Sequence, residues 1–460
     1  DVRPMESRGG FMNQQTVTET LRDALIRGDR DSVRAYAEEL HAVDLADLLE
    51  EIEPTQAWST LEMLPLETRA EVFGYFEGDF QVALADVIKR NKLAAIVSCM
   101  NSDERADLFN RLTEDQQEAL LPALAQAERE DIRRLSAHDE GTAGAIMTSD
   151  YASLTPDLTA RQALDKLRRE APDKETINRA FVLDAERKLV GVVRLQAVIL
   201  ANPSEKVSAF MERDSHAAHV NEDQEEVARA IAKYDVVALP VLDDDGRLVG
   251  IVTHDDAIDV LQEEATEDFQ KIATVGKINV NMRDAGMGLL YRKRISWLIL
   301  LIFGNLLTGI GIAFFEETIA TYVVLVFFMP VLVGSAGNAG SQAATLMIRA
   351  LATGDVENRD WARLLGREFL VALALGLTMA VAISAVGHFR GGEEIALVVA
   401  LSMVAVVMIG SLTGMSLPFL LSRLNLDPAT ASAPLITTIA DVTGVVIYFA
   451  IATAILGLPA

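Results

Sequence analysis

A single carboxylate interrupts the last long apolar segment of the sequence. Asp441 is the one charged residue between positions 428 and 460. An ionised carboxylate at the centre of a bilayer costs at least about 2.5–3.5 kcal/mol on insertion scales, so it must face a polar cavity, a partner or an ion. No basic residue lies deep in another apolar segment, and we therefore favour a cation site. The alternative is a structural aspartate that bonds to the hydroxyl of Thr437 or Thr438, or that lies near a membrane surface.

A second distinctive motif, GSAGNAGSQAAT, lies in an earlier apolar segment. Gly334, Gly337 and Gly340 recur every three residues, which leaves one face of a helix without side chains. Such a face either lets two helices pack closely or lines an ion path with backbone oxygens and the side-chain oxygens of Asn338 or Gln342. The motif alone favours neither interpretation.

Membrane-spanning helices must position these residues. A spanning helix takes about 20 predominantly apolar residues, and five stretches of at least that length lack Asp, Glu, Lys and Arg, apart from Asp441. They are 295–315, 318–348, 369–389, 395–422 and 428–460. We therefore expect a five-helix α transmembrane domain over 291–460.

Charge divides the chain at the same boundary. The net charge is −26, from 67 acidic and 41 basic residues, yet 291–460 holds only 10 acidic and 9 basic residues. The acidic excess therefore belongs to the first 290 residues. Arginine and lysine gather before the first apolar stretch and between the second and third. By the positive-inside rule, the acidic half is cytosolic and the C-terminus lies outside.

Composition also excludes several classes of protein. A strongly acidic chain lacks the basic surface that binds nucleic acid. The single cysteine, Cys99, rules out an intramolecular disulfide and a cysteine metal cluster. The sequence has no Walker loop, GxSxG elbow or HExxH helix, so we do not expect an enzyme.

Short helices are predicted for residues 1–140. ADLLEEI at Ala46, AEVFGYF at Ala70 and ADLFNRL at Ala106 recur at intervals of 24 and 36 residues. Both intervals are multiples of 12, which indicates short helices stacked in a superhelical array. We expect an α-helical N domain.

A tandem repeat is predicted for residues 141–262. FVLDAERKLVGVV and ALPVLDDDGRLVGIV each read as strand, turn and strand, and Gly191 and Gly250 mark the same position 59 residues apart. A helical stretch precedes each strand pair and a shorter one follows, which predicts two β-α-β-β-α units. Residues 263–290 then connect these units to the transmembrane domain.

Several signatures resemble, in the same order, those of the MgtE family of magnesium channels: EGTAGAIM, two cystathionine-β-synthase (CBS) modules, EEATEDFQKIA, GSAGNAGSQAAT and LDPATASAPLITTIADVTGVVIYF. The resemblance covers essentially the whole chain. It implies a homodimer in the bacterial plasma (inner) membrane, surrounded by lipid, with five spans per subunit, a central pore and a plug helix over 263–290. It also implies passive Mg²⁺-selective influx, which cytosolic Mg²⁺ closes by binding between the N, CBS and plug regions.

The resemblance assigns roles to individual residues. Asp441 matches the pore acid, and Asp427 matches the acid that opens the DPA motif at the cytosolic mouth. The implied pore-lining residues are Gly337, Asn338, Ser341 and Thr437, although the family usually has asparagine at the position of Ser341. The implied Mg²⁺ sensors are acids of the first 290 residues: Glu71, Asp103, Asp107, Glu225, Asp235, Asp256, Asp259, Glu267 and Asp268.

ATP is a second ligand that the CBS resemblance brings in. Thr253 and Asp256 in the second repeat form the Thr-x-x-Asp that such modules place at the ribose, whereas residues 194–197 of the first repeat lack the acid. The aromatic residue expected before the first strand pair is also absent. The missing acid argues against ATP binding at the first repeat. The missing aromatic residue weakens the case that the chain binds ATP.

Two other functions stay open at this point. One is an ion-coupled secondary divalent-cation transporter that uses Asp441 as its coupling site. The other is a membrane-anchored nucleotide sensor that transports nothing.

Overall fold

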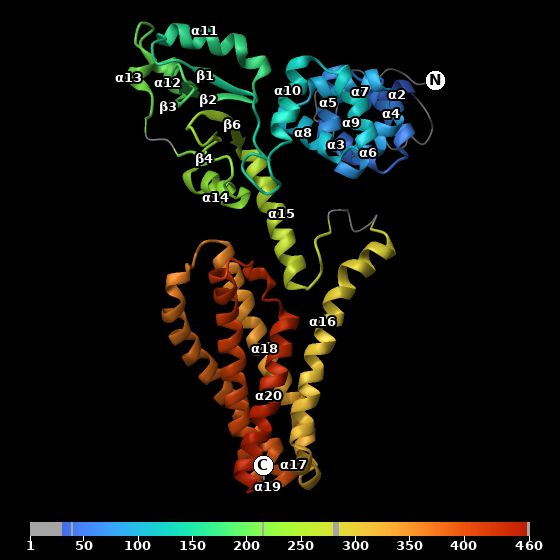
Figure 1. Cartoon of the computed structure of the whole chain (residues 1–460), viewed down its shortest axis with the longest axis vertical. Helices are drawn as coiled ribbons and strands as arrows, with labels where there is room; N and C mark the ends of the chain where they lie inside the picture. The colour runs from blue at the N-terminus through green and yellow to red at the C-terminus, as the bar shows by residue number, and fades with distance from the viewer. Residues whose placement is uncertain (1–29, 38–39, 214–215, 279–284, 458–460) are drawn as a thin grey trace, which may run out of the picture. The chain divides into compact units, whose positions relative to one another are not determined.

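The structure, a computed structural model, describes residues 30–37, 40–213, 216–278 and 285–457. It divides into two compact units, which we call the first unit (1–262) and the second unit (263–460) (Figure 1). The first 29 residues of the expected N domain lie outside the described residues, as do residues 279–284 of the expected connecting segment.

Short helices build the N domain, as the repeats predict. Leu45, Phe73, Leu84 and Ile96 are fully buried where the apolar faces of these helices meet. The helices are α2 (Arg30–Ala37), α3 (Ala42–Glu50), α4 (Pro54–Leu61), α5 (Leu66–Tyr75), α6 (Gly78–Val87), α7 (Arg90–Cys99), α8 (Ser102–Arg111), α9 (Glu114–Leu120) and α10 (Gln126–Leu135). Helices two positions apart in the chain pack against each other, as α3 does on α5, α5 on α7 and α6 on α8. This pattern confirms a superhelical stack.

Two β-α-β-β-α units follow, which confirms the predicted repeat. The first is β1 (Tyr151–Leu154), α11 (Ala160–Glu170), β2 (Thr176–Leu183), β3 (Leu189–Arg194) and α12 (Leu195–Leu200). After α13 (Val207–Phe210), the second is β4 (Ala218–His219), α14 (Gln224–Tyr234), β5 (Ala238–Leu242), β6 (Leu248–Thr253) and α15 (His254–Ile272). In each sheet the first two strands are parallel and the last two antiparallel.

The N domain and the repeats share apolar cores inside the first unit. Ala106 of α8 and Leu135 of α10 are buried in the core of the second repeat beside Val220 and Val241. Phe181 of the first repeat and Ile251 of the second lie in another common core. These shared cores hold α8 against the second repeat.

The connecting helix is longer toward the N-terminus than the sequence analysis expects. Helix α15 begins at His254, directly after β6, and continues to Ile272 without a break. Residues 273–278 are not helical, and α16 (Met287–Phe314) begins after them. The last helix of the second repeat and the connecting helix are therefore a single helix.

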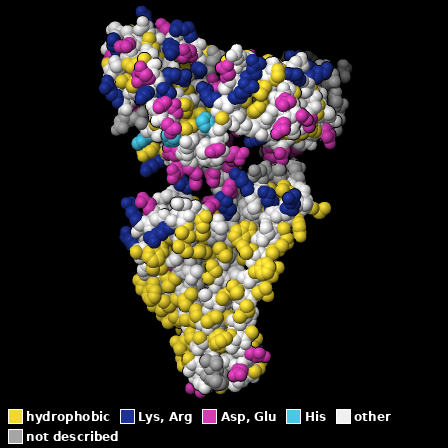
Figure 2. Space-filling model, in the orientation of Figure 1, with side chains coloured by type: hydrophobic (Ala, Val, Ile, Leu, Met, Phe, Trp, Pro, Cys, Tyr) yellow, Lys and Arg dark blue, Asp and Glu magenta, His cyan; other side chains and the backbone are white. Residues whose placement is uncertain are grey.

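Long apolar helices make up the second unit. They are α16, α18 (Val324–Ala352), α19 (Trp361–Arg423) and α20 (Ala433–Leu456), with the short α17 (Glu316–Thr321) between the first two. In the described part of the chain, four helices are long and apolar enough to cross a membrane. Hydrophobic side chains cover the visible face of this unit, and lysine and arginine gather near one of its ends (Figure 2).

Helix α19 is a hairpin of two helical arms. Gly392 interrupts it with a φ of 84°, a left-handed conformation that glycine adopts most readily. A Cβ added to Gly376 would lie 3.0 Å from Cα of Val404, and one added to Gly387 would lie 2.9 Å from Cα of Ala396. The arms therefore run antiparallel, and they cover the third and fourth apolar stretches of the sequence.

Glycine allows α18 and the second arm of α19 to cross at backbone contact. A Cβ added to Gly414 would lie 2.0 Å from the carbonyl oxygen of Gly340, and one added to Gly410 would lie 2.3 Å from that of Ala336. Helices this close gain extensive van der Waals contact, which drives their association in lipid.

The substitution Gly414→Ala tests this crossing. The added methyl group has no space, so we expect a loss of about 1–3 kcal/mol in the free energy of unfolding, seen as a lower midpoint in thermal unfolding of the purified full chain. Gly366→Ala is the control, because no atom lies within 4 Å of a Cβ there. Equal midpoints for the two variants would contradict the packing argument.

Candidate functional site

The carboxylate of Asp441 has no partner within the described chain. Asp441 lies in α20 and is half-buried, and no hydrogen bond or ion pair joins it to another described residue. Thr437 and Thr438, the hydroxyls that could have satisfied it, both donate to the carbonyl of Pro434, at 2.9 Å each. The structural alternative for Asp441 therefore loses its hydrogen-bond donors.

Helix α18 meets α20 one turn before Asp441. A Cβ added to Gly337 would lie 3.0 Å from Cγ2 of Thr437, and Ser341 Oγ donates to the carbonyl of Ala433 at 3.5 Å. Three of the four expected pore-lining residues therefore meet at this crossing, whereas Asn338 is exposed on another side of α18. The close-packing interpretation of the glycine motif holds at Gly337, and the ion-path interpretation stays a prediction.

Asp427 is held by the connecting helix. One carboxylate oxygen accepts from the backbone N–H of Ala429 at 2.8 Å, and the other lies 2.5 Å from Nζ of Lys271. Lys271 also pairs with Glu267, whose second oxygen lies 2.8 Å from Nζ of Lys277. These four side chains, which we call the mouth cluster, alternate in charge and join α15 to the turn that opens α20.

The mouth cluster corrects the sequence analysis in one respect. The expected sensor Glu267 and the expected mouth acid Asp427 do come together, but both pair with Lys271, which the sequence analysis did not single out. The spacing of Glu267 and Lys271, four residues apart on a helix, is the signal that could have found one pair. Burial, with the nearby charge of Asp427, raises the pKa of the expected sensor Asp268 to about 6.

A second group of acids lies in the first unit, where α8 meets the second repeat. We call it the acidic cluster: Asp103, Glu104, Glu175 and Asp256. Burial is the main cause that raises the pKa of Asp103 well above its usual range, and the charges of Asp256, Glu175 and Glu104 add to it. Burial likewise raises the pKa of Glu104 and of Glu175 to about 7. One oxygen of Asp103 is buried without a hydrogen-bond partner among the described residues.

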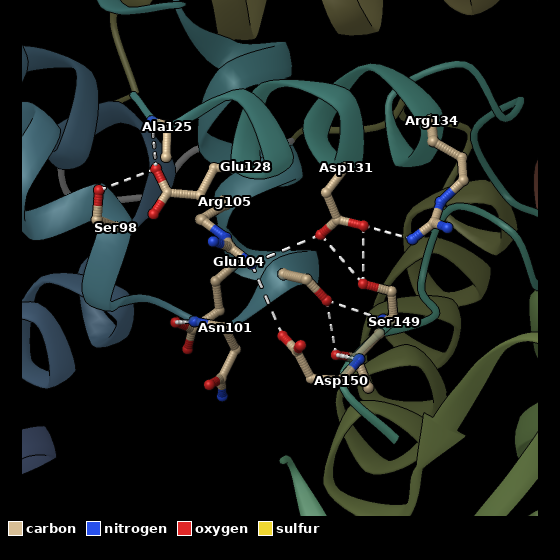
Figure 3. Close-up of polar contacts among 12 residues, drawn as sticks. Ser98, Asn101, Glu104, Arg105, Ala125, Glu128, Asp131, Arg134, Ser149 and Asp150 are labelled. Atoms are coloured by element: carbon tan, nitrogen blue, oxygen red, sulfur yellow. Dashed lines mark hydrogen bonds and ion pairs between the residues drawn. The ribbon is translucent and has the colours of Figure 1, made fainter. Parts of the chain in front are cut away.

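Contacts between α8 and the start of the repeats hold this cluster in place. Ser102 Oγ lies 2.9 Å from Oγ1 of Thr148 and accepts from the N–H of Ser149 at 2.8 Å. Asn101 donates to Glu175 at 3.2 Å. Arg105, also on α8, lies 3.5 Å from Asp131 and 3.7 Å from Asp150. Figure 3 shows these two contacts of Arg105.

The sequence analysis missed two members of the acidic cluster. Glu104 lies three residues after Asn101 and accepts its N–H at 3.4 Å, so its spacing signalled a helix cap rather than an ion site. Glu175 lies in the turn before β2, and no motif in the sequence connects it to α8. Tertiary contact alone brings these two acids to Asp103.

The remaining expected sensors lie outside the acidic cluster. Asp107 and Glu71 are exposed on the N domain, and both raise the pKa of Glu104 through their charge. Asp259 is exposed on α15, and burial with the charge of Asp255 raises its pKa. Glu225 and Asp235 belong to α14, where Glu225 pairs with Arg229 and Asp235 ends the helix at a φ of 52°.

The described acids are not arranged as a metal-binding site. In residues 30–37, 40–213, 216–278 and 285–457, no three or more Asp, Glu, His or Cys side chains converge on a common point that could hold a metal ion. The arrangement thus provides carboxylates with raised pKa values, close enough to repel one another. A divalent cation would have to draw them together.

The two polar residues of the Thr-x-x-Asp motif in the second repeat hydrogen-bond to each other. Thr253 is buried, its hydroxyl donates to Asp256, and its N–H donates to the same carboxylate at 3.4 Å. In the first repeat, Arg194 stands at the corresponding position and pairs with Glu212 at 3.2 Å. Asp256 therefore belongs both to the expected nucleotide motif and to the acidic cluster.

Family models match most of the chain. A model described as MgtE, divalent cation transporter, matches residues 329–451, and one described as MgtE intracellular N domain matches residues 40–141. The CBS domain model matches residues 143–203 and 207–263. The three regions correspond to the long apolar helices, the N domain and the repeat pair.

Curated relatives are similar over nearly their whole length. The magnesium transporter MgtE of Thermus thermophilus is 36% identical over 446 residues, which is 96% of this chain and 99% of that protein. The magnesium transporter MgtE of Bacillus subtilis is 35% identical over 435 residues, 94% of this chain and 95% of that protein.

Two solved structures each resemble about half of this chain. The soluble part of a magnesium transporter has a TM-score of 0.52 and 29% identity, covering 55% of this chain and 100% of that one. The cytosolic domain of the Mg²⁺ channel MgtE in complex with ATP has a TM-score of 0.51 and 34% identity, covering 53% of this chain and 99% of that one. By length, identity and domain order, this chain belongs to the MgtE family of magnesium transporters.

Proposed function

We propose that the protein is a Mg²⁺-selective channel that admits Mg²⁺ passively and is closed by cytosolic Mg²⁺. The observation that carries the proposal is the unpaired carboxylate of Asp441 inside a helix of spanning length. A charge in that position needs a compensating ion. The relatives named above are magnesium transporters, which supports Mg²⁺ as that ion.

The pore is formed by two copies of the chain. Each chain crosses the bacterial inner membrane five times, because the two arms of α19 each provide a crossing. The N-terminus is cytosolic and the C-terminus lies outside. Two copies of Asp441 then provide two negative charges near one axis, which matches a divalent ion. Mg²⁺ sheds its water reluctantly, so the ion passes hydrated, against the carboxylates and the oxygens of Asn338, Ser341 and Thr437.

The mouth cluster supports a gate at the cytosolic end. Lys271 places an ammonium group on Asp427, where a permeating cation would otherwise bind. While this ion pair holds, α15 stays attached to the turn that opens α20, and the mouth acid is neutralised. Opening therefore requires the end of α15 to leave Asp427.

The acidic cluster supports a sensor that controls this gate. Two carboxylates about 6 Å apart repel by roughly 3 kcal/mol at an effective dielectric of about 20. Mg²⁺ between the acids reverses that repulsion and favours the compact arrangement of α8 and the second repeat. Helix α15 carries Asp256 near its start and Lys271 near its end, so the sensor and the gate share one helix. Several weak sites acting together make closure steep.

ATP is a second candidate ligand, because the cytosolic domain of one relative is solved with ATP. In this chain Asp256 would have to leave the acidic cluster to serve a ribose, so ATP and Mg²⁺ binding would be coupled through one carboxylate.

The competing candidate is an ion-coupled secondary transporter. The carboxylate of Asp441 is as compatible with a coupled transporter as with a channel, because a carboxylate in a membrane can also bind a coupling proton or sodium ion. The two differ in driving force. Mg²⁺ flux into liposomes that persists when proton and sodium gradients are collapsed supports the channel, and flux that stops supports the transporter.

Asp441→Asn removes the charge and keeps the shape of the side chain. We expect Mg²⁺ influx into proteoliposomes, followed with an internal Mg²⁺ dye, to fall at least about tenfold, because 1.4 kcal/mol corresponds to tenfold and a charge pair at 4 Å is worth about 4 kcal/mol at a dielectric of 20. Asp355→Asn is the control, since that carboxylate accepts a hydrogen bond from Thr353 in a loop. Undiminished influx in Asp441→Asn would overturn the pore assignment.

Asp103→Asn and Asp256→Asn test the sensor. Each removes one ligand charge from the acidic cluster, so we expect the internal Mg²⁺ concentration for half-closure to rise several-fold in patch recordings. Asp115→Asn, on the exposed surface of α9, is the matched control. Identical half-closure in all these variants would exclude the cluster as the sensor.

The raised pKa values of the acidic cluster predict a pH dependence of stability. Glu104 binds a proton up to pH about 7 in the folded state but only to about 4.3 in the unfolded chain. The folded state therefore holds more protons in this window, and Glu104 lowers the free energy of unfolding as pH rises from about 4.5 to 7. We expect Glu104→Gln to remove about 1–3 kcal/mol of this decline.

Urea unfolding of residues 1–262, followed by the fluorescence of Trp58, measures this decline. Added Mg²⁺ should also reduce it, because the ion replaces the protons. Glu186→Gln, in an exposed turn, should keep the wild-type decline. A Glu104→Gln variant with the same pH profile as wild type would show that Glu104 is not forced to hold a proton.

A further inference from the structure

A pocket opens between the two arms of α19 at the end away from Gly392. Toward Gly392 the arms are in contact, and a hydrogen bond from Ser411 Oγ to Glu368 joins them. Beyond that link lies a pocket of about 470 Å³, a size typical of small-molecule sites. All of its lining residues belong to α19, with Trp361 from the first arm and the others from the second.

The lining changes from apolar to cationic along the second arm. Leu412 and Leu420 provide apolar walls, Ser416 provides a hydroxyl, and Arg423 stands at the mouth. The guanidinium of Arg423 lies over the ring of Trp361, 5.7 Å from its centroid. No carboxylate in the described part of the chain pairs with this guanidinium, so the mouth carries an uncompensated positive charge.

The spacing of these groups follows the layers of a lipid leaflet. Ser416 lies seven residues before Arg423, which is about 10 Å deeper along a helix. A phosphate, the ester groups below it and an acyl chain below those occur in the same order in a phospholipid. Tryptophan and arginine are also the residues that occupy the boundary between headgroups and hydrocarbon.

We propose that this pocket binds one anionic phospholipid of the cytosolic leaflet. The phosphate pairs with Arg423, the ester groups reach Ser416, and one acyl chain lies against Ile409 and Leu412. The proposal relies on the orientation given under Proposed function, in which the ends of α19 face the cytosol. It does not depend on which ion the protein conducts.

Charge complementarity favours a lipid over a second copy of the chain. The cytosolic leaflet is rich in anionic lipids, and basic pockets between transmembrane helices on that side bind their headgroups. A guanidinium also binds phosphate through two parallel hydrogen bonds. A partner helix would have to bury Arg423 without a counter-charge, at a high desolvation cost.

Quenching of Trp361 by bromine-labelled lipids tests the proposal in the full chain reconstituted into vesicles. Trp58 and Trp297 are first replaced by phenylalanine, so that Trp361 alone reports. We expect bromine-labelled phosphatidylglycerol to quench Trp361 at a mole fraction about ten times lower than bromine-labelled phosphatidylcholine, as for a charge-assisted phosphate contact. Ser416→Phe fills the pocket and should weaken quenching by phosphatidylglycerol.

Two arginine variants decide which group causes the preference. Arg423→Gln should abolish the difference between the two lipids. Arg390→Gln is the matched control, because Arg390 also lies over an aromatic ring, that of Phe327 at 4.5 Å, but lines no part of this pocket. Equal quenching by both lipids, or a preference that survives Arg423→Gln, overturns the proposal. Absence of quenching by either lipid would also overturn it, because the pocket would then be closed to lipid.

Discussion

A carboxylate that leaves bulk water needs a proton, a basic side chain or a metal ion to balance it. This chain shows the first two, and it also holds a further carboxylate without a partner among the described residues. Asp427 has a basic side chain in Lys271, and Glu104 keeps a proton to about pH 7. Asp441 has no partner in the described chain. In the proposed function an ion from solution balances the last carboxylate, and the first two place acids where an ion can compete with what already binds them.

The two units satisfy different packing conditions around these acids. In the first unit, water drives burial, and leucine and alanine faces form cores that carry α8 onto the second repeat. In the second unit, lipid is as apolar as leucine, so burial from the solvent does not hold the helices together. Close backbone contact at Gly340 and Gly414 holds them together instead, through van der Waals packing. Asp441 lies one turn after Thr437, which contacts Gly337 of α18. Larger side chains on α18 would push α20 away from α18 and move Asp441 with it.

Patterns that depend on neighbours along the chain were predictable. The apolar stretches, the strand–turn–strand repeats and the helical N domain all follow from spacing within one segment. The partners of the acids were not, because they come from distant segments. Glu175 reaches Asp103 only through the fold, and Lys271 meets Asp427 across more than 150 residues of chain. The start of α15 also escaped prediction, because no turn residue separates the end of β6 from the acidic helix.

The continuity of α15 has a consequence for how this chain can vary. Asp256 and Lys271 lie fifteen residues apart on one helix, which is about 22 Å along the axis and about 60° around it. Each residue inserted or deleted between them would turn one relative to the other by about 100°. Asp256 and Lys271 would then no longer occupy their present relative positions on the helix, even though every acid and lysine was still present. The number of residues in this helix is therefore under the same constraint as the identity of the residues at its ends.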